Sequence, residues 1–284
     1  MDSGGGPGNT DSTLCAGSYD VVVTDANGCT GSTTVVATEP SLLVSPGSST
    51  NVTCFGFCDG TASVIAAGGS PPYTYDWATD PIVGDGTANV TNLCPGSYTC
   101  TVTDTNACSA TYIATIIQPA VLTLTMSQVN ATCGGMCDGS ATATITGGIP
   151  PYNYVWSNGS STTTGVLSNT ISSLCAGIYT VDVTDGNGCI ISGSVTITEP
   201  LVLVATASAT NVTCFGLCNG TATVVVVGGN GGETFDWDPD PIVGDGTASV
   251  TNLCPGTYTV TVVDNTGICT DTGVVVITQP ALLV

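Results

Sequence analysis

The chain has 284 residues and a formal charge of −21 at pH 7, because it contains 21 Asp and Glu residues and no Lys, Arg or His. No cation is present to neutralise phosphates, so the composition excludes nucleic-acid binding, and an anionic membrane surface would repel the chain. The chain also lacks the His and Lys that most general-base and Schiff-base catalysts use, and we expect no enzymatic activity.

The cysteine content indicates the compartment in which the chain folds and acts. Fifteen cysteines accompany 42% hydrophobic residues, a composition typical of small secreted domains whose cores are supplemented by disulfides. The apolar runs are short and broken by Gly, Thr and Pro, well below the roughly 18 residues that a membrane-spanning helix needs. We therefore expect an extracellular or cell-surface protein without membrane insertion.

A phrase of the form Cys-x-Gly-x-Tyr recurs along the chain, starting at Cys15, Cys94, Cys175 and Cys254. A constant spacing of about 80 residues is typical of small domains copied in tandem. Each repeat closes on Glu-Pro or Gln-Pro, and an apolar strand follows without a flexible linker. The predicted domains are residues 1–40 (the C-terminal half of a repeat), 41–119, 120–200 and 201–280 (three full repeats), and 281–284 (the first strand of a following repeat).

Residues 41–119 represent a full repeat. Alternating apolar and polar positions predict strands over residues 42–54, 61–67, 73–77, 87–93, 97–103 and 108–117. No segment has a helical pattern. Six or seven short strands per repeat predict an all-β fold of tandem immunoglobulin-like β-sandwich repeats of about 80 residues, disulfide-bonded and arranged end to end. In the recurring phrase, Tyr98, Tyr179 and Tyr258 form either a tyrosine corner or ordinary core positions.

A longer period overlies the short one. The sequence Asp-Pro-Ile-Val-Gly-Asp-Gly at Asp80 recurs 160 residues later at Asp240. We call residues 41–119 and 201–280 the type A repeats, and residues 1–40 and 120–200 the type B repeats. Two long periods span 320 residues, 36 more than the 284 present. Strand donation by Ala281–Val284 to a second copy would leave those 36 residues missing, so we expect an excerpt of a longer covalent array instead.

The full repeats share two further motifs. Cys-x-Gly-x-Cys-Asp/Asn-Gly spans residues 54–60, 133–139 and 214–220, and Gly-Gly-x-Pro-Pro-Tyr-x-Tyr-x-Trp spans residues 68–77 and 147–156. Together with Leu-Cys-x-Gly-x-Tyr and Val-Thr-Asp-x-Asn-Gly-Cys, they make residues 9–284 resemble the SprB-type repeat of bacterial gliding-motility adhesins and related cell-surface proteins. The last full repeat departs from the pattern, since Gly228–Phe235 replaces the Pro-Pro-Tyr turn.

The resemblance implies long secreted filaments or adhesins and supplies no catalytic residues. We therefore expect a structural component of an extracellular bacterial filament or surface fibre, whose partners are copies of itself end to end. The alternative is a cell-surface adhesin whose repeat loops bind glycans or surfaces.

The cysteines are expected to lie at the two ends of each sandwich. Cys54, Cys58 and Cys94 would share one end, while Cys108 would lie across a strand of roughly 20 Å, too far for a disulfide. Either two clustered cysteines pair locally and the third bridges to the next repeat, for example to Cys189, or all bonds stay inside a repeat of different topology. The cysteines predicted to form disulfides are Cys54, Cys58, Cys94, Cys108, Cys133, Cys137, Cys175, Cys189, Cys214, Cys218, Cys254 and Cys269.

Cys100 differs from these twelve. It occupies the position that Val181 and Val260 take in the other full repeats, on an inward-facing strand position. We therefore expect a buried free thiol there.

Clustered carboxylates suggest the one cofactor that this composition favours. Hard oxygen ligands near one another suit Ca²⁺, whereas Asp beside Pro and Gly also serves in ordinary turns. The candidate calcium ligands are Asp76, Asp80 and Asp85 in one type A repeat and Asp236, Asp238, Asp240 and Asp245 in the other.

Sequons of the form Asn-x-Ser/Thr predict possible glycan attachment at the surface, although they also arise by chance in a chain rich in Thr and Asn. They stand at Asn51, Asn89, Asn130, Asn158, Asn211 and Asn219.

Overall fold

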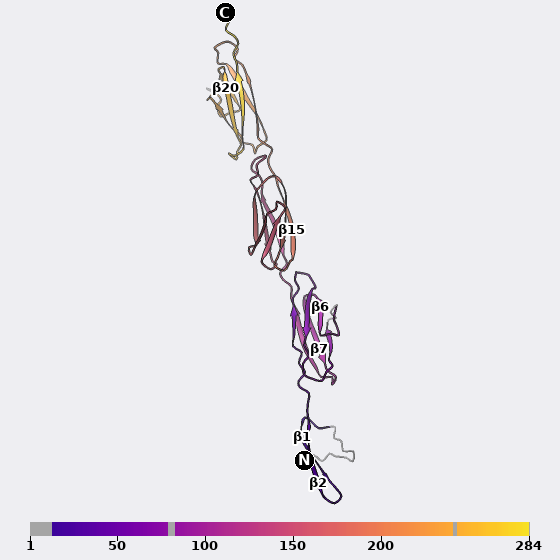
Figure 1. Ribbon diagram of the computed structural model, residues 1–284. Coiled ribbons are helices and arrows are strands. Elements are labelled where there is room, and N and C mark those ends of the chain that lie inside the picture. The colour runs from indigo at the N-terminus through magenta and orange to yellow at the C-terminus, as the bar shows by residue number, and fades with distance from the viewer. Residues whose placement is uncertain (1–12, 79–82, 241–242, 284) are drawn as a thin grey trace. The chain divides into compact units, whose positions relative to one another are not determined.

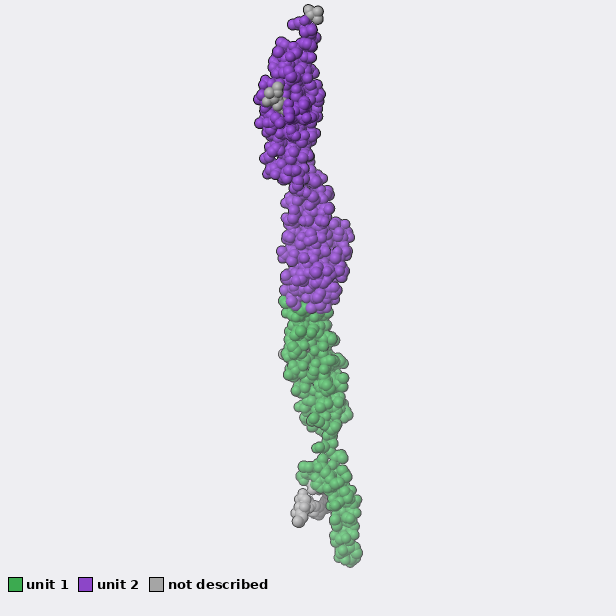
Figure 2. Space-filling view, turned by 90° about the vertical axis from the view of Figure 1, so that its left-hand side faces the viewer, with its two compact units in different colours: residues 1–119 green, residues 120–284 purple. Residues whose placement is uncertain are grey.

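The computed structural model describes residues 13–78, 83–240 and 243–283. Over these residues the secondary structure consists of strands, and none of the described segments forms a helix able to cross a membrane. The chain divides into two compact units, residues 1–119 and 120–284 (Figure 2).

The first unit contains a hairpin and one full repeat. The hairpin pairs β1 (Gly17–Thr24) with β2 (Thr30–Ala37) in antiparallel register. In the full repeat, one three-stranded sheet has the order β3-β4-β6 and the other has the order β5-β7-β8. Figure 1 labels β6 of the first sheet and β7 of the second. Their bounds are β3 (Gly47–Thr50), β4 (Gly60–Val64), β5 (Thr74–Ala78), β6 (Asn89–Leu93), β7 (Gly96–Thr103) and β8 (Ser109–Ile116).

The second unit contains two full repeats. The sheets of residues 120–200 have the orders β13-β10-β9 and β12-β11-β14-β15, and those of residues 201–280 have the orders β16-β17-β19 and β18-β20-β21. The bounds are β9 (Thr123–Val129), β10 (Gly139–Thr146), β11 (Tyr152–Trp156), β12 (Ser161–Thr164), β13 (Ser168–Leu174), β14 (Gly177–Thr184), β15 (Ile190–Ile197), β16 (Val204–Thr210), β17 (Gly220–Val227), β18 (Thr234–Asp238), β19 (Ser249–Leu253), β20 (Gly256–Val263) and β21 (Thr270–Ile277).

The pairing order is that of an immunoglobulin sandwich. In the type B repeat, the first, second and fifth strands pair in one sheet, and the remaining four pair in the other. This arrangement confirms the predicted all-β, immunoglobulin-like fold. It also places the loop after the first strand and the loop before β14 at one end, with the β14–β15 hairpin at the other.

The predicted first strand over residues 42–54 is shorter than expected. Regular pairing begins at Gly47, and before it only an isolated bridge joins Val44 to Ala67. Pro46 lies between these segments and lacks the N–H that a continuous ladder requires, although its carbonyl accepts the N–H of Ile65 at 2.8 Å. The proline therefore interrupts the strand.

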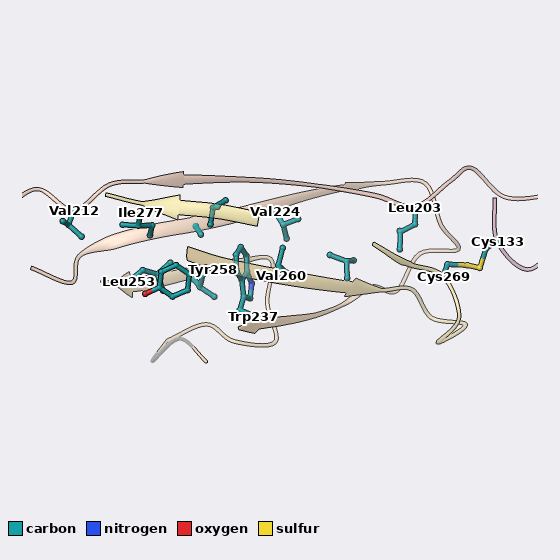
Figure 3. Packing of buried hydrophobic residues seen from close by; sticks show 14 residues of the cluster. Cys133, Leu203, Val212, Val224, Trp237, Leu253, Tyr258, Val260, Cys269 and Ile277 are labelled. Atoms are coloured by element: carbon teal, nitrogen blue, oxygen red, sulfur yellow. A yellow bond between two sulfur atoms is a disulfide. The ribbon is translucent and has the colours of Figure 1, made fainter. Parts of the chain in front are cut away.

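Each full repeat buries a tryptophan in its core. Trp77 and Trp237 have no exposed surface, and their indole N–H groups donate to the carbonyls of Thr87 and Thr247, each at 3.0 Å. Figure 3 shows Trp237 among the apolar side chains of both sheets. Cys100 is a fully buried free thiol as predicted, and desolvation raises its pKa.

The tyrosines of the recurring phrase form hydrogen-bonded corners. The hydroxyls of Tyr98, Tyr179 and Tyr258 donate to the carbonyl of the cysteine four residues earlier, at 3.0, 3.1 and 3.1 Å. Tyr19 makes the same bond to the carbonyl of Cys15 at 2.8 Å. Of the two interpretations, the tyrosine corner is confirmed.

Candidate interface between repeats

One disulfide recurs inside each full repeat. It joins the second cysteine of Cys-x-Gly-x-Cys to the cysteine that opens the tyrosine phrase, as Cys58–Cys94, Cys137–Cys175 and Cys218–Cys254. The sequence separations are 36, 38 and 36 residues. Closing a loop of this length stabilises a domain by about 4 kcal/mol in the chain-entropy model.

A second kind of disulfide crosses between repeats. Cys133 of the type B repeat is bonded to Cys269 of the following type A repeat, with 5.6 Å between Cα atoms and a sequence separation of 136 (Figure 3). Both cysteines are 5% exposed. Of the two pairing schemes that the sequence left open, the second unit shows the one with a local pair and a bridge to the next repeat.

We call the first cysteine of Cys-x-Gly-x-Cys the loop cysteine and the cysteine after the last hairpin turn the hairpin cysteine. The loop cysteines are Cys54, Cys133 and Cys214, and the hairpin cysteines are Cys29, Cys108, Cys189 and Cys269.

Close backbone approach accompanies the Cys133–Cys269 bond. A Cβ atom added to Gly134 would lie 2.5 Å from the backbone N of Val202 and 2.7 Å from the carbonyl O of Pro200. The side-chain amide of Asn230 also donates to the carbonyl of Thr132 at 2.9 Å. Beside the bond, a pocket of about 260 Å³ is lined by residues of both repeats, Met136 and Ile268 among them. The loop of one repeat and the start of the next therefore pack directly.

In each of the three full repeats, a buried aspartate shapes the hairpin that carries the hairpin cysteine. The Oδ1 atom of Asp185 accepts the N–H groups of Asn187 and Cys189, both at 2.9 Å, and its Oδ2 accepts that of Ile149 at 2.9 Å. Asp104 repeats the pattern with its own hairpin. The sequence showed this aspartate only as part of the Val-Thr-Asp-x-Asn-Gly-Cys motif, and its role was not predicted.

Backbone and side-chain donors replace cations around these carboxylates. The N–H of Ser70 is the largest influence that lowers the pKa of Asp104. In the last repeat, the Thr266 hydroxyl, followed by the amide groups of Asn230, lowers the pKa of Asp264 to about 2. A buried carboxylate is thus kept ionised by hydrogen bonds to its charged form.

At the opposite end of each sandwich, the Asp or Asn of Cys-x-Gly-x-Cys-Asp/Asn-Gly forms hydrogen bonds across the loop that carries the loop cysteine. Asp138 accepts the backbone N–H and the hydroxyl of Thr132, and Asp59 does the same with Thr53. The threonine hydroxyl is the main cause that lowers the pKa of both carboxyls. In the last repeat, Asn219 takes the place of this aspartate. Its side-chain oxygen accepts the Thr213 N–H at 3.1 Å, and its side-chain amide donates to the Thr213 hydroxyl oxygen at 2.8 Å.

Two cysteines of the predicted disulfide set are not bonded. Cys108 and Cys214 are free and exposed, whereas Cys54 and Cys189 take part in disulfides. No cysteine of this sequence lies 136 residues from either of them, the separation seen in Cys133–Cys269. Cys15 and Cys29, which were not in the predicted set, are also free and exposed.

Comparison with known proteins supports the motif analysis. The family model described as "SprB repeat" matches residues 47–80, 125–161 and 206–241, one match in each full repeat. The chain carries SprB repeats. No curated protein matches the chain.

Several solved structures have weak similarity. The N-terminal eight Ig domains of Down Syndrome Cell Adhesion Molecule share 15% identity, with 93% of this chain and 38% of that one covered and a TM-score of 0.28. The ectodomain of mouse nectin-like molecule 4 shares 12% identity over 84% of this chain and 96% of that one, with a TM-score of 0.33. A tetra-tandem repeat from the extending region of a large adhesion protein shares 18% identity over 95% and 84%, with a TM-score of 0.25.

The acidic loop of the last SprB repeat brings three of its four predicted ligands together. Carboxylate oxygens of Asp236, Asp240 and Asp245 lie within 4.8 Å of one another and are exposed, and among the described residues this group leaves out Asp238. The Oδ1 atom of Asp245 already accepts the N–H groups of Trp237 at 3.1 Å and Gly246 at 2.9 Å.

The other type A SprB repeat has the same turn. Asp85 accepts the N–H groups of Trp77 and Gly86 at 3.1 and 2.9 Å. Asp76 is exposed on β5, and Asp80 lies outside the described residues. These hydrogen bonds account for Asp85 and Asp245 in the two type A repeats, and calcium binding stays a prediction.

The sequon asparagines are exposed in all six cases. Three have a structural contact, because the side-chain oxygens of Asn51, Asn130 and Asn211 accept the N–H groups of Ile117, Thr198 and Thr278 at 3.0, 3.1 and 2.8 Å. This bond ties the start of the loop in each SprB repeat to the end of its last strand. It explains why these asparagines precede the loop cysteine by three residues, and glycan attachment stays a prediction.

Proposed function

We propose that this chain is a structural component of an extracellular bacterial filament or surface fibre built from tandem SprB repeats. The observation that carries the proposal is the Cys133–Cys269 disulfide, which joins one repeat covalently to the next. A bond of this kind resists separation of neighbouring domains, which is a requirement of a fibre and not of a freely hinged receptor.

The composition supports a structural role. The described pocket at the repeat junction is lined mainly by apolar side chains and the disulfide, and a chain without Lys, Arg or His offers few groups for acid–base chemistry. The functional residues of the SprB repeats serve folding and linkage.

The disulfides support an extracellular or cell-surface location, because they form and persist in oxidising compartments. We propose that the partners are further copies of the same chain, arranged end to end. A loop cysteine and a hairpin cysteine recur in every full repeat, so each additional repeat carries the cysteines for a bond of this kind.

A second candidate is an adhesin whose loops bind glycans or surfaces. The three matches to the SprB repeat favour it, since the resemblance implies surface adhesion as well as filament formation. Selective binding on a glycan array would support this candidate, and uniform absence of binding would remove it.

Electron microscopy of the native material tests the filament. We expect fibres whose polypeptide, after reduction and denaturation, runs either as a very large chain or as discrete subunits of 28.1 kDa. The first result supports a covalent array and the second supports assembly from separate copies. Secreted protein that stays monomeric and forms no fibres would overturn the proposal.

A further inference from the structure

The last full repeat differs from the others at one position of its Gly-Gly turn. Asn230 follows Gly228 and Gly229, where the other two full repeats have Ser70 and Ile149. The backbone N–H of all three residues donates to the Oδ2 atom of the buried hairpin aspartate, at 2.9 Å for Ser70 and Ile149 and at 3.1 Å for Asn230. The backbone of the turn therefore makes the same contact in every full repeat, and the difference lies in the side chain.

The side-chain amide of Asn230 bonds to two repeats at once. Its Nδ2 atom donates to the Asp264 carboxylate at 2.8 Å and to the backbone carbonyl of Thr132, in the preceding repeat, at 2.9 Å. A side-chain amide carries two N–H groups, so one can serve each acceptor. Thr132 lies 98 residues before Asn230 in the chain. The amide therefore joins the buried carboxylate of one repeat to the loop backbone of the other.

These bonds lie beside the Cys133–Cys269 disulfide. The Nδ2 atom of Asn230 is 3.6 Å from Cys269 Sγ, and the Thr132 carbonyl oxygen is 3.4 Å from the same sulfur atom. Thr132 is also the residue immediately before Cys133. The amide therefore holds the backbone next to one cysteine and contacts the sulfur atom of the other.

The hairpin of the last repeat differs together with its turn. In residues 41–119, the hairpin residue Asn106 donates its side-chain amide to Ser70 Oγ at 2.9 Å. The corresponding hairpin position of the last repeat is Thr266, whose hydroxyl donates to Asp264 Oδ1. In one type A repeat the asparagine amide is thus on the hairpin and bonds within the repeat, and in the other it is on the turn and bonds to the preceding repeat.

The two groups that Asn230 joins are both hydrogen-bond acceptors. The Asp264 carboxyl stays ionised, because the Thr266 hydroxyl and the Asn230 amide lower its pKa to about 2, and a backbone carbonyl has no hydrogen to donate. A chain without Lys, Arg or His has no cationic side chain to place between them. An amide with two N–H groups meets this requirement, whereas a carboxylate or an apolar side chain would leave both acceptors without a shared donor.

We propose that Asn230 is the positioning residue of the inter-repeat disulfide, and that it holds Cys269 against the loop of the preceding repeat so that Cys133 and Cys269 pair. The inference rests on the proposed fibre function and names the side chain that directs its covalent junction. In the pairing step each thiol loses a proton and one S–S bond forms. The two protons and two electrons pass to one oxidised glutathione, whose own S–S bond breaks to give two thiols.

Disulfide exchange with glutathione tests the role of Asn230 in the full chain. The chain is equilibrated at several ratios of reduced to oxidised glutathione and quenched with N-ethylmaleimide. Because it has no Lys or Arg, it is then cleaved with an Asp- or Glu-specific protease. Mass spectrometry gives the oxidised fraction of each disulfide, and hence the equilibrium constant for its formation.

Two substitutions remove the amide donor. Asn230→Ser introduces the residue that the other type A repeat has at this position, and we expect the equilibrium constant for the Cys133–Cys269 bond to fall about fivefold. Asn230→Asp keeps the size of the side chain and places a carboxylate against two acceptors, so we expect that constant to fall roughly tenfold or more.

Asn158→Asp is the matched control. It makes the same change of charge in an exposed turn of the preceding repeat, where an aspartate can still accept the Ser160 N–H that Asn158 accepts at 3.0 Å. It should leave the Cys133–Cys269 equilibrium unchanged. The Cys218–Cys254 bond lies inside the last repeat and is measured in the same samples. It should keep its equilibrium constant in all three variants, because it reports the fold of that repeat alone.

Three results would overturn the inference. The first is an unchanged Cys133–Cys269 equilibrium in either Asn230 variant, and the second is an equal fall in the Asn158→Asp control. The third is an equal fall of the Cys133–Cys269 and Cys218–Cys254 equilibria, which would assign Asn230 to the fold of its own repeat. All three leave the proposed fibre function standing, and that function fails instead if the native material forms no fibres.

Discussion

At the residue scale, the buried aspartates of the hairpins make the stability of the folded chain depend on pH. Asp264 is 3% exposed and has its pKa lowered to about 2 by the Thr266 hydroxyl and the Asn230 amide groups. A depressed carboxyl pKa contributes stability above the unfolded value of roughly 3.9, and that contribution is lost as the pH falls through the folded value.

We therefore expect the melting temperature of the chain to fall between about pH 4 and pH 2. Scanning calorimetry across this range measures the effect. The Thr266→Val variant should lose less stability over the same interval, because it no longer favours the ionised carboxylate. A melting temperature independent of pH between 4 and 2 would contradict this role.

Calcium is the second question at this scale. If Asp236, Asp240 and Asp245 bind Ca²⁺ through the oxygens that lie within 4.8 Å of one another, millimolar calcium raises the melting temperature and chelation reverses the change. The Asp236→Asn/Asp240→Asn variant should lose the response, while Asp182→Asn, on an exposed strand position, should retain it. Equal responses of the two variants would assign the effect to general screening of charge.

Residue roles divided between those that sequence could predict and those that it could not. The buried thiol of Cys100 followed from its position in the repeat, and the tyrosine corner was one of two interpretations that the repeated phrase left open. The role of Asp185 did not, because the partner of its second oxygen, Ile149, lies 36 residues away and forms the contact only after the sandwich folds. Cys108 and Cys214 were wrongly assigned because a repeating cysteine was taken to be a bonded one.

At the scale of elements, the absence of a side chain at Gly134 lets the loop of one repeat lie directly against the start of the next repeat in the second unit. A methyl group there would lie 2.5 Å from the backbone N of Val202, so Gly134→Ala should force the loop away from the next repeat. We expect the Cys133–Cys269 bond to be reduced several-fold faster by dithiothreitol, as followed by alkylation and mass spectrometry.

Gly165→Ala is the matched control for this substitution, since a Cβ atom there meets nothing within 4 Å. It should leave the reduction rate unchanged. Equal rates for Gly134→Ala and the unaltered chain would show that the junction tolerates the added methyl group.

The strands themselves were largely predictable, because alternation of apolar and polar residues fixes which face of a sheet is buried. Two departures have local causes. Pro46 interrupts the first strand of residues 41–119, and the type B repeat gains β12 (Ser161–Thr164) where the type A repeats have their Asp- and Pro-containing loop. Turn residues at these positions override the pattern.

For the whole molecule, the charge of −21 opposes every contact between copies. Screening of like charges increases as the Debye length falls from about 30 Å at 0.01 M salt to about 8 Å at 0.15 M. We expect copies of the chain to associate into fibres faster at 0.15 M than at 0.01 M sodium chloride, measured from the initial rise in light scattering. A rate that falls with salt would indicate an attractive electrostatic contact that the composition does not provide.

The period alone predicts the division of the chain into repeats, while the covalent connection between repeats required the structure. The sequence could place the loop and hairpin cysteines at opposite ends of a sandwich, yet it left two pairing schemes open. The Cα separation of 5.6 Å between Cys133 and Cys269 selects one of them for the second unit.

The Cys133–Cys269 bond also decides how the second unit responds to tension. A force applied to its two ends travels from residue 120 to Cys133, crosses the sulfur atoms and continues from Cys269. The intervening residues, over a sequence separation of 136, carry none of the load, whatever the strength of their strands. Optical-trap extension of the oxidised chain should lack the roughly 450 Å of contour length that this segment stores, and the added length should become available once a reductant opens the bond.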